Sequence, residues 1–574
     1  MPSSLCDLAR RVAFALVALS LAVDAAAKPR YVESPPLDKV VTTPVGEVAG
    51  GSTLQVPIIT WGADIATILA NGNAERTAKG SDFAAKGLDL SLVREDKFPQ
   101  QLASYLSGKS PYLRGTMGML NMAAVLLSRD PRTRPVVIYQ LSWSAGGDAL
   151  VVKPGIHSAK DLKGKTIALQ AYGPHVDYLS KILADAGLSP KDVTIRWLPD
   201  LTGTGDTPMA ALHEPDVDAA FVITPDALAL TSNGTVGTGA EDSVRGARVL
   251  LSTKTANRII ADVYAVRADY FAAHSDQVQT FVKGLMEGQD QLKRLMADKQ
   301  SPAYRDAMGA AAEILLDSRQ AVSDVEGLYA DAELVGPKGN QDFFANPDYP
   351  RSFQRLTREI QGSFTAMGLL EAPVSLEQTK WDYAKLGQGL TAGATTGVRF
   401  DSEQVAAVVA RRQQQGTLAA GEIFSFEIFF KPNQNSFSVD LYKDAFDKVI
   451  DLASTYGGAL ITIEGHSDPM GYLRKKQAGE SELVLGRIKQ SAKNLSLSRA
   501  VAVRDAIVTH AKSAGISLDP SQLAVVGHGI ADPKSGLCGT DPCAPKSERE
   551  WRDNMRVEFR VIQVEAEESV FRPL

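Results

Sequence analysis

The chain has 574 residues, of which 44% are hydrophobic and 22% are charged. This is the composition of an ordinary globular protein and excludes a mainly disordered or fibrous chain. The formal net charge of −6 argues against a nucleic-acid binder, which needs a basic face, and the three cysteines exclude a disulfide-dense fold.

Residues 1–27 have the pattern of a secretory signal peptide. Two arginines precede a 12-residue apolar run at 12–23, and small residues follow at 25–27, so we expect cleavage before Lys28. The run is too short to cross a hydrocarbon core of about 30 Å as a helix. We therefore expect an exported mature chain without a transmembrane span, with an uncleaved anchor as the alternative.

The cysteines divide into two groups. Cys6 precedes the apolar run and would leave with the signal peptide. Cys538 and Cys543 lie in the segment LCGTDPCAP, and in an exported chain this close pair predicts a disulfide. The segment has no further ligands at zinc spacing, so we predict neither a metal site nor a cofactor.

Residues 28–52 are rich in Pro, Val and Thr and predict an extended leader. From residue 53 to residue 390, β-like apolar runs alternate with helix-like segments, which predicts an α/β fold with largely parallel sheets. The expected strands are 54–60, 136–139, 150–152, 166–169, 194–197, 219–222, 248–251 and 260–266. The expected helices include 100–107, 117–128, 175–186 and 275–297.

A joint at residues 391–420 contains glycines and a polar helical stretch at 402–415. The second body, residues 421–565, has a β-α-β-α-β-β order and predicts a compact α+β domain, followed by a tail at 566–574. Its expected elements are strand 423–430, helix 439–456, strand 460–464, a long helical region ending at 514, and strands 523–526 and 556–562.

Several turns of the first body have the features of a small-molecule site. The segments 60–64, 114–119, 141–150 and 169–179 carry glycines and polar residues, and most lead from a strand into a helix. Helix N-termini offer unpaired N–H groups, and glycine lets a ligand approach the backbone. The alternative is that these are ordinary turns and that their aromatic residues pack in the core.

Residues 53–390 resemble the nitrate/sulfonate/taurine-type periplasmic solute-binding proteins of ABC importers. The resemblance rests on TWGADIATILANG, SAGGDALVV and HSAKDLKGKTIALQAYGPH. It implies a bilobed, type II-like fold with lobe two at about 149–258, hinge closure on a small polar or anionic solute, and an ABC importer permease as partner. The ligand-facing positions that it implies are Trp61, Thr116, Ser144, Tyr172, Thr224 and Asp226.

An enzyme is the alternative within this fold. A pyrimidine synthase that resembles these binders depends on a cysteine-rich motif, whereas residues 28–537 contain no cysteine. We also find no GxSxG or HExxH motif, and we interpret His175, at a helix start, as structural. We therefore predict a non-catalytic protein.

In the second body, ITIEGHSDPMG places an acid directly after a strand, and LSLSRAVAVRDAI places Arg499 early on an amphipathic helix. A fixed carboxylate and a fixed guanidinium can together hold a zwitterionic group. The alternative is that the two side chains are solvated or pair with each other.

With LAVVGHGIADP and DNMRVEFRV, these segments resemble the OmpA-like peptidoglycan-binding domain. The resemblance implies that Asp468 and Arg499 hold the diaminopimelate of the stem peptide and that Asn554 and Arg556 support them. The chain departs from the family by a charged insertion at about 472–493 and by Trp551 where an arginine is usual.

The two resemblances predict a periplasmic, peptidoglycan-associated protein, which would also be classed with the outer membrane. It would capture a solute with its first body and attach to the wall through its second. The alternative is a structural envelope protein whose first body no longer binds a transported solute.

Overall fold

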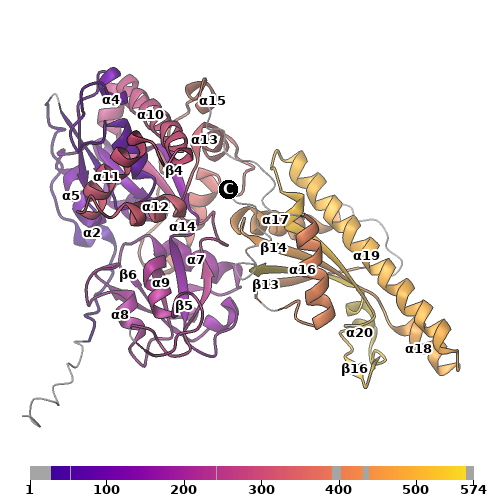
Figure 1. Cartoon of the computed structure of the whole chain (residues 1–574). Coiled ribbons are helices and arrows are strands. Elements are labelled where there is room, and N and C mark those ends of the chain that lie inside the picture. Colours follow the sequence, from indigo (N-terminus) through magenta and orange to yellow (C-terminus); the bar gives the residue numbers. More distant parts are fainter. Residues whose placement is uncertain are drawn as a thin grey trace, which may run out of the picture.

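The computed structural model describes residues 28–51, 53–240, 242–390, 402–419, 421–430 and 439–563. The predicted signal peptide, part of the predicted joint and the predicted tail lie outside these ranges. Figure 1 shows two α/β lobes stacked on each other and a C-terminal domain beside them. Among the described residues, no helix has both the length and the apolarity needed to span a bilayer.

Lobe one contains two sheets. One pairs β1 (Leu54–Ile58) in parallel with β2 (Leu90–Arg94). The other has the order β11-β4-β10-β3, and these neighbours are antiparallel. Its strands are β11 (Ala332–Leu334), β4 (Pro135–Ser144), β10 (Ala261–Arg267) and β3 (Tyr112–Thr116), and β12 (Glu377–Gln378) pairs in parallel with β4.

Helices surround these sheets, and most of their apolar faces join one large core. They are α3 (Asp64–Ala70), α4 (Asp82–Ala85), α5 (Phe98–Leu106), α6 (Met117–Ser128), α10 (Ala268–Ala297), α11 (Pro302–Leu316), α12 (Val322–Asp331), α13 (Gly336–Ala345), α14 (Phe353–Ala366) and α15 (Tyr383–Leu386).

Lobe two is built on a five-stranded sheet with the order β7-β6-β8-β5-β9. Its strands are β5 (Asp148–Val152), β6 (Thr166–Gln170), β7 (Thr194–Leu198), β8 (Ala219–Ile223) and β9 (Arg248–Ser252). Its helices are α7 (His175–Asp185), α8 (Pro208–Leu212) and α9 (Thr224–Leu230).

The prediction of largely parallel sheets is wrong. In lobe two, β6 is parallel to β7 and β8, but β5 is antiparallel to β8 and β9. The chain enters lobe two through residues 145–147 and returns through residues 253–260, so β4 and β10, which flank this excursion, run in opposite directions in lobe one.

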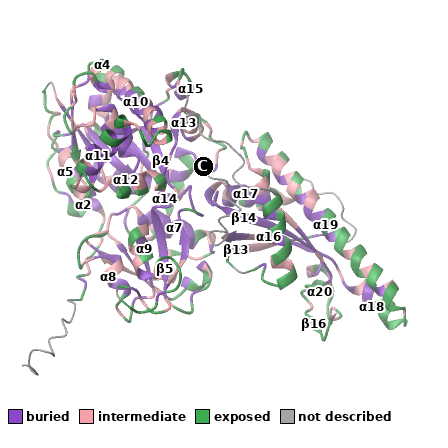
Figure 2. Cartoon of the chain, in the orientation of Figure 1, coloured by how far each residue is buried: buried purple, intermediate pink, exposed green. Residues whose placement is uncertain are grey.

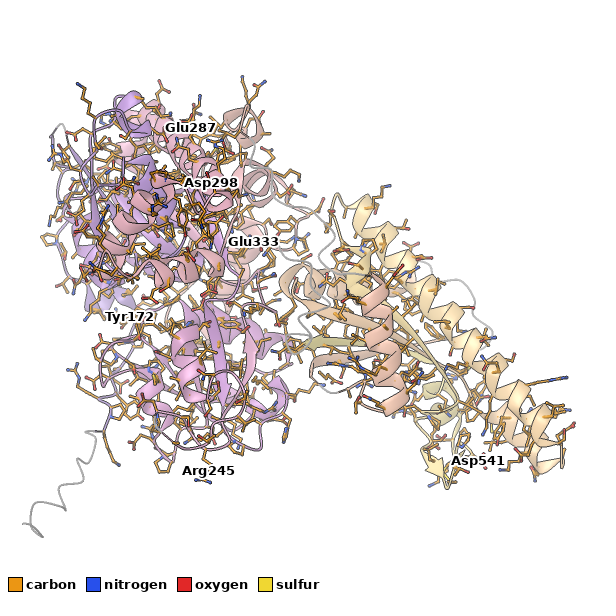
Figure 3. All side chains as sticks on the ribbon, in the orientation of Figure 1. Tyr172, Arg245, Glu287, Asp298, Glu333 and Asp541 are labelled. Carbon is orange, nitrogen blue, oxygen red and sulfur yellow. A yellow bond between two sulfur atoms is a disulfide. The ribbon has the colours of Figure 1, made fainter. Side chains whose placement is uncertain are left out.

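The leader is mostly extended, but it packs across both lobes. On lobe two, Val32 N donates to Trp197 O at 2.9 Å, and the Tyr172 hydroxyl donates to Pro35 O at 2.7 Å. The chain then forms the single turn α2 (Leu37–Val40), and Asp38 pairs with Arg129 of lobe one. The leader is therefore a strap between the lobes, at the edge where Figure 3 places Tyr172.

The main sheet of the C-terminal domain has the order β13-β18-β14-β15, and the elements of the domain follow the predicted order with additions. The strands are β13 (Glu422–Phe429), β14 (Ala459–His466), β15 (Leu523–Gly529) and β18 (Arg556–Gln563). The helices are α16 (Ser402–Gln415), α17 (Val439–Thr455), α18 (Met470–Gln477), α19 (Glu482–Ser513) and α20 (Glu548–Asp553).

The insertion at 472–493 forms most of α18 and the first turns of α19. These helices project from the sheet, and Figure 2 shows much of their surface exposed. Tyr472, Leu485 and Ile530 form a small core at their base. The predicted disulfide between Cys538 and Cys543 is confirmed; it closes the loop that carries the short strands β16 (Leu537–Cys538) and β17 (Asp541–Pro542).

Candidate functional site

The first crossing between the lobes is built around two glycines. A Cβ at Gly147 would lie 2.7 Å from the ring of Trp61, and a Cβ at Gly146 would lie 2.6 Å from Asp331 Oδ1. Thr224, the first residue of α9, donates its hydroxyl to Gly146 O. Because neither glycine has a side chain, groups from both lobes approach the backbone of the crossing directly.

A buried network ties this crossing to the second one. The hydroxyl of Ser144 donates to Asp148 Oδ2 at 2.6 Å, and its oxygen lies 2.9 Å from Thr253 Oγ1. Thr253 Oγ1 also accepts from Gly146 N at 3.0 Å, and Asp148 Oδ1 lies 2.7 Å from His175 Nε2. Asp148 thus fixes the buried imidazole of His175, in agreement with a structural role for this histidine.

Trp61 is held by a second network in lobe one. Its indole N–H donates to Ser142 Oγ at 3.0 Å, and Ser142 donates to Asp262 Oδ2 at 3.0 Å. Arg114, on β3, bridges Asp262 and Asp64 through its guanidinium, and all three side chains are almost fully buried. From the sequence, Arg114 could be assigned only to a turn. Its burial is possible because Asp64 of α3 and Asp262 of β10 neutralise its charge.

The six predicted solute-binding residues do not form one cluster. Trp61, Ser144 and Thr224 gather at the glycine crossing, and Asp226 follows on α9. Thr116 is buried and caps α6 by accepting from Met119 N at 3.1 Å. Tyr172 has a left-handed backbone (φ 60°) and binds the leader.

Two acids lie close to the crossing: Asp226 on α9, which the sequence pointed to, and Asp331 beside Gly146, which it did not. Burial, with a smaller contribution from Asp148, raises the pKa of Asp331 to about 6. Burial also raises the pKa of Asp226, whose Oδ2 is buried without a hydrogen-bond partner among the described residues. The nearby cations are Lys254 beside Asp331 and, when protonated, His175. A positively charged group on a ligand would relieve this excess of carboxylates.

In the C-terminal domain, Asp468 and Arg499 lie where α19 crosses the carboxyl end of β14. A Cβ at Gly465 would lie 2.1 Å from Ser496 O, so only glycine permits this approach of the helix to the strand. Arg499 follows Ser496 by about one turn, and Asp468 comes directly after Ser467, whose hydroxyl donates to Ala492 O.

Both charged groups are only partly satisfied. Arg499 is 7% exposed, and its Nε has no hydrogen-bond partner among the described residues; burial lowers its pKa. Asp468 Oδ1 is also buried without a partner, and burial raises the pKa of this carboxyl although Trp551 donates to it. Within the described part of the chain, the two side chains form no ion pair with each other.

The other two predicted wall-binding residues, Asn554 and Arg556, form hydrogen bonds and ion pairs within the domain. Asn554 is fully buried and holds Ser535, from which its Oδ1 accepts the backbone N–H at 3.2 Å. Arg556 is 2% exposed and pairs with Glu427 at 3.0 Å and with Asp532 at 3.2 Å. Both residues stabilise the loop and sheet beside the site.

Two groups of described residues have donor atoms close enough for a metal ion: Glu464, His466 and His528, and His466, Asp532 and Glu558. The rings of His466 and His528 stack at 4.7 Å and are tilted by only 6°, so their in-plane lone pairs do not converge. Arg560 Nε lies 3.0 Å from Glu464, and burial with Arg556 lowers the pKa of His466 to about 2. These arginines would repel a cation, and we assign no metal here.

Comparisons with known proteins concern the N-terminal region. Residues 78–294 match a family model described as NMT1/THI5 like. The curated taurine-binding periplasmic protein of Escherichia coli (strain K12) is 31% identical over 157 residues, which are 27% of this chain and 44% of that protein. The chain therefore spans less than half the length of this curated relative.

Solved structures with a similar fold include sulfonate-binding proteins. The periplasmic aliphatic sulphonate binding protein SsuA from Escherichia coli is 16% identical, with a TM-score of 0.40 over 61% of this chain and 97% of that one. A putative periplasmic sulfonate-binding SsuA from Methylobacillus flagellatus KT is also 16% identical, with a TM-score of 0.41 over 60% of this chain and 96% of that one. The family match supports the predicted periplasmic-binding-protein fold of mixed α/β type for the N-terminal region.

Proposed function

We propose that this protein binds a small polar solute between its two N-terminal lobes and attaches to peptidoglycan through its C-terminal domain. It would act in the periplasm as a non-catalytic binding protein, associated with the wall. The observation that carries the solute-binding half is the polar crossing between two α/β lobes in a region that matches a family of solute-binding domains.

The two acids close to the crossing favour one class of solute. We expected a polar or anionic ligand, but Asp226 has an unpaired carboxylate oxygen and Asp331 keeps a raised pKa of about 6. An ammonium group on the solute would satisfy the free oxygen of Asp226 and would favour the ionised form of a buried carboxyl beside it. We therefore favour a solute that carries an amino group, whether or not it also carries an acid. An ABC importer would receive this solute.

The wall-binding half rests on Asp468 and Arg499. Each keeps a buried polar atom without a partner, and leaving such groups unpaired is unfavourable by about 1–3 kcal/mol each. A diaminopimelate side chain supplies both counterparts, because its ammonium suits the carboxylate and its carboxylate suits the guanidinium. The alternatives of solvated charges or a mutual ion pair fit this burial less well.

Replacing Asp468 by Asn or Arg499 by Met in the full mature chain is expected to weaken retention on diaminopimelate-type sacculi at least tenfold. Each change removes one charge-assisted contact to the zwitterion. Co-sedimentation with purified sacculi measures the retention. The matched controls are Asp505→Asn and Arg504→Met, which alter an exposed pair on the same helix and leave retention unchanged.

Lysine-type sacculi are a further control, because their stem peptide lacks the second carboxylate. If both variants sediment with diaminopimelate-type sacculi as the parent does, the wall-binding assignment is wrong.

Taurine is expected to raise the thermal midpoint of the N-terminal body, whereas isethionate, which has a hydroxyl in place of the amino group, is not. A ligand that binds only the folded state stabilises it by RT ln(1 + L/Kd), where L is the ligand concentration, so the midpoint rises with the ratio of ligand concentration to Kd. Calorimetry of the full chain measures both, with Asp226→Asn expected to abolish the difference. Equal shifts from the two compounds would refute the preference for an amino group. No shift from taurine, other sulfonates, nitrate or amino acids would favour the structural alternative.

A further inference from the structure

Lys181, on α7 of lobe two, binds carboxylates from three bodies at once. Its Nζ lies 3.0 Å from Asp185 on the same helix, 3.4 Å from Glu359 on α14 of lobe one, and 2.8 Å from Asp451 on α17 of the C-terminal domain. The ammonium group is almost fully buried. One cation thus joins both lobes and the predicted wall-binding domain. We call Lys181 and its three carboxylate partners, Asp185, Glu359 and Asp451, the Lys181 junction.

Further polar contacts extend the junction. Arg351, which precedes α14, pairs with Glu359 at 3.1 Å and donates from Nε to Arg258 O at 2.8 Å. Tyr456, just after α17, donates its hydroxyl to Asp185 Oδ2 at 2.7 Å. Burial raises the pKa of Asp451, but Lys181 and Arg351 outweigh it and hold that pKa below its ordinary value.

The C-terminal domain also touches the second crossing between the lobes. Two backbone hydrogen bonds link them: Arg258 N donates to Thr455 O at 3.2 Å, and Gly458 N donates to Thr255 O at 3.1 Å. A Cβ at Gly458 would lie 1.9 Å from Lys254 O, so any side chain there would push the domain off the crossing. Figure 1 shows the domain beside both lobes at the level where they meet.

The interface combines close contacts with incomplete packing. Arg351 Nη2 is buried without a hydrogen-bond partner among the described residues. A cavity of about 340 Å³ lies between lobe two and the C-terminal domain, lined by Leu150, Ile182 and Arg248 on one side and by Glu422 and Ile423 on the other. Buried ion pairs add little net stability, and domain interiors leave few voids of this size. We therefore expect the C-terminal domain to separate from the lobes more readily than a well-packed domain would.

The C-terminal domain contacts one of the two segments that join the lobes. Lobe movement in a two-lobed binding protein is absorbed by the crossing segments, here 145–147 and 253–260. The C-terminal domain binds α7 through Asp451 and residues 255–258 through backbone hydrogen bonds, and Lys181 of α7 also binds Glu359 of α14. A change of lobe angle would therefore break some of these contacts. A ligand or contact that prefers one state of a two-state element shifts the whole equilibrium.

We propose that the C-terminal domain is a latch on the crossing of the N-terminal body, so that its docking and the lobe arrangement of this structure form one coupled equilibrium. The C-terminal domain would then stabilise this arrangement of the lobes, and a change of lobe angle would loosen the domain. The inference rests on the proposed function only in assuming that the lobes move to admit a solute. Its test needs no solute, so failure of solute binding and failure of the latch are distinguishable.

Two variants of the full mature chain undock the domain by different means. Gly458→Val introduces a steric clash with the backbone of Lys254, and Asp451→Asn removes the domain's charge from the junction. The matched controls are Gly486→Ala, whose Cβ meets open space, and Asp447→Asn, one turn earlier on α17, where the carboxylate pairs with Lys443 and His510.

Hydrogen exchange and lobe distance are measured in each variant. We expect the amides of Arg258 and Gly458 to exchange at least tenfold faster in both variants and at the parental rate in both controls. Spin labels at Lys79→Cys in lobe one and Lys191→Cys in lobe two, both exposed positions, report the lobe distance. We expect undocking to lower the population at the parental lobe distance several-fold in favour of other distances.

Two results would overturn the proposal. If the amides exchange faster but the lobe distances stay as in the parent, docking and the lobe arrangement are independent. If neither variant speeds exchange at Arg258, the Lys181 junction does not hold the domain. Protection of the β14 and β18 amides from exchange monitors whether the C-terminal domain remains folded in each variant.

Discussion

Replacing Arg114 by Met is expected to lower the free energy of unfolding of the N-terminal body by about 3–5 kcal/mol. Arg114 is fully buried on β3, where its guanidinium binds Asp64 at 2.8 Å and Asp262 at 3.0 Å. Methionine keeps much of the apolar volume but leaves two carboxylates buried without their counterion. Removing one partner of a buried ion pair is costly because the other charge stays desolvated.

The measurement is urea unfolding of the full chain, followed by tryptophan fluorescence. Arg76→Met is the matched control, because Arg76 pairs with Asp89 at the surface, and exposed pairs contribute about 1 kcal/mol or less. The triple variant Arg114→Met, Asp64→Asn, Asp262→Asn is expected to recover much of the lost stability, since no buried charge remains. A single variant as stable as the Arg76 control would contradict this account.

The case of Arg114 also shows what the sequence could predict about the fold. Buried strands such as β8 and the first half of β4 were found because their apolar runs are continuous. Strands β2 and β3 were missed, because LSLVR and YLRGT mix polar residues into short runs. An arginine inside a fully buried strand becomes intelligible only once Asp64 and Asp262 are placed beside it.

Strand direction and the interdomain contacts could not be predicted from the sequence, because they too depend on residues that are distant along the chain. Whether β5 pairs in parallel or antiparallel depends on β8 and β9, strands of the same lobe that come much later in the chain. Lys181 and Asp451 are 270 residues apart, and each follows the pattern of a solvated helix charge. Asp468 and Arg499 could be named as candidates because they lie in short motifs, and their role as a wall-binding pair stays a prediction.

Replacing Asp177 by Asn is expected to stabilise the N-terminal body at neutral pH and to flatten its pH dependence. Asp177 lies on α7, one turn before Lys181, and both of its carboxylate oxygens are buried without a hydrogen-bond partner among the described residues. A Cβ at Gly118 would lie 2.7 Å from this carboxyl group, so the carboxyl packs tightly against α6. Burial raises the pKa of Asp177 to about 8, although Arg351 opposes the shift and Glu359 adds to it.

The direction in which stability changes with pH follows from the number of protons bound by the folded and unfolded states. The folded state holds the proton of Asp177 up to about pH 8, whereas the unfolded chain loses it near pH 3.8. Between these values the unfolded state binds fewer protons, so stability falls as pH rises, by up to about 1.4 kcal/mol per pH unit. Above about pH 8 both states are ionised, and this contribution becomes constant. Asparagine resembles the neutral acid and does not titrate, so its advantage over aspartate should grow from pH 5 to pH 8 and then level off.

Urea midpoints at pH 5, 6, 7 and 8 test this expectation in the parent and in Asp177→Asn. Asp192→Asn is the control, because hydrogen bonds from Ser189 lower the pKa of Asp192, so its carboxyl is ionised in both states over this range. The difference between this control and the parent should therefore not change with pH. A constant difference between Asp177→Asn and the parent from pH 5 to pH 8 would mean that Asp177 is already ionised in the folded protein. Its charge would then have to be balanced by Arg351 in the same polar junction that holds the C-terminal domain against the lobes.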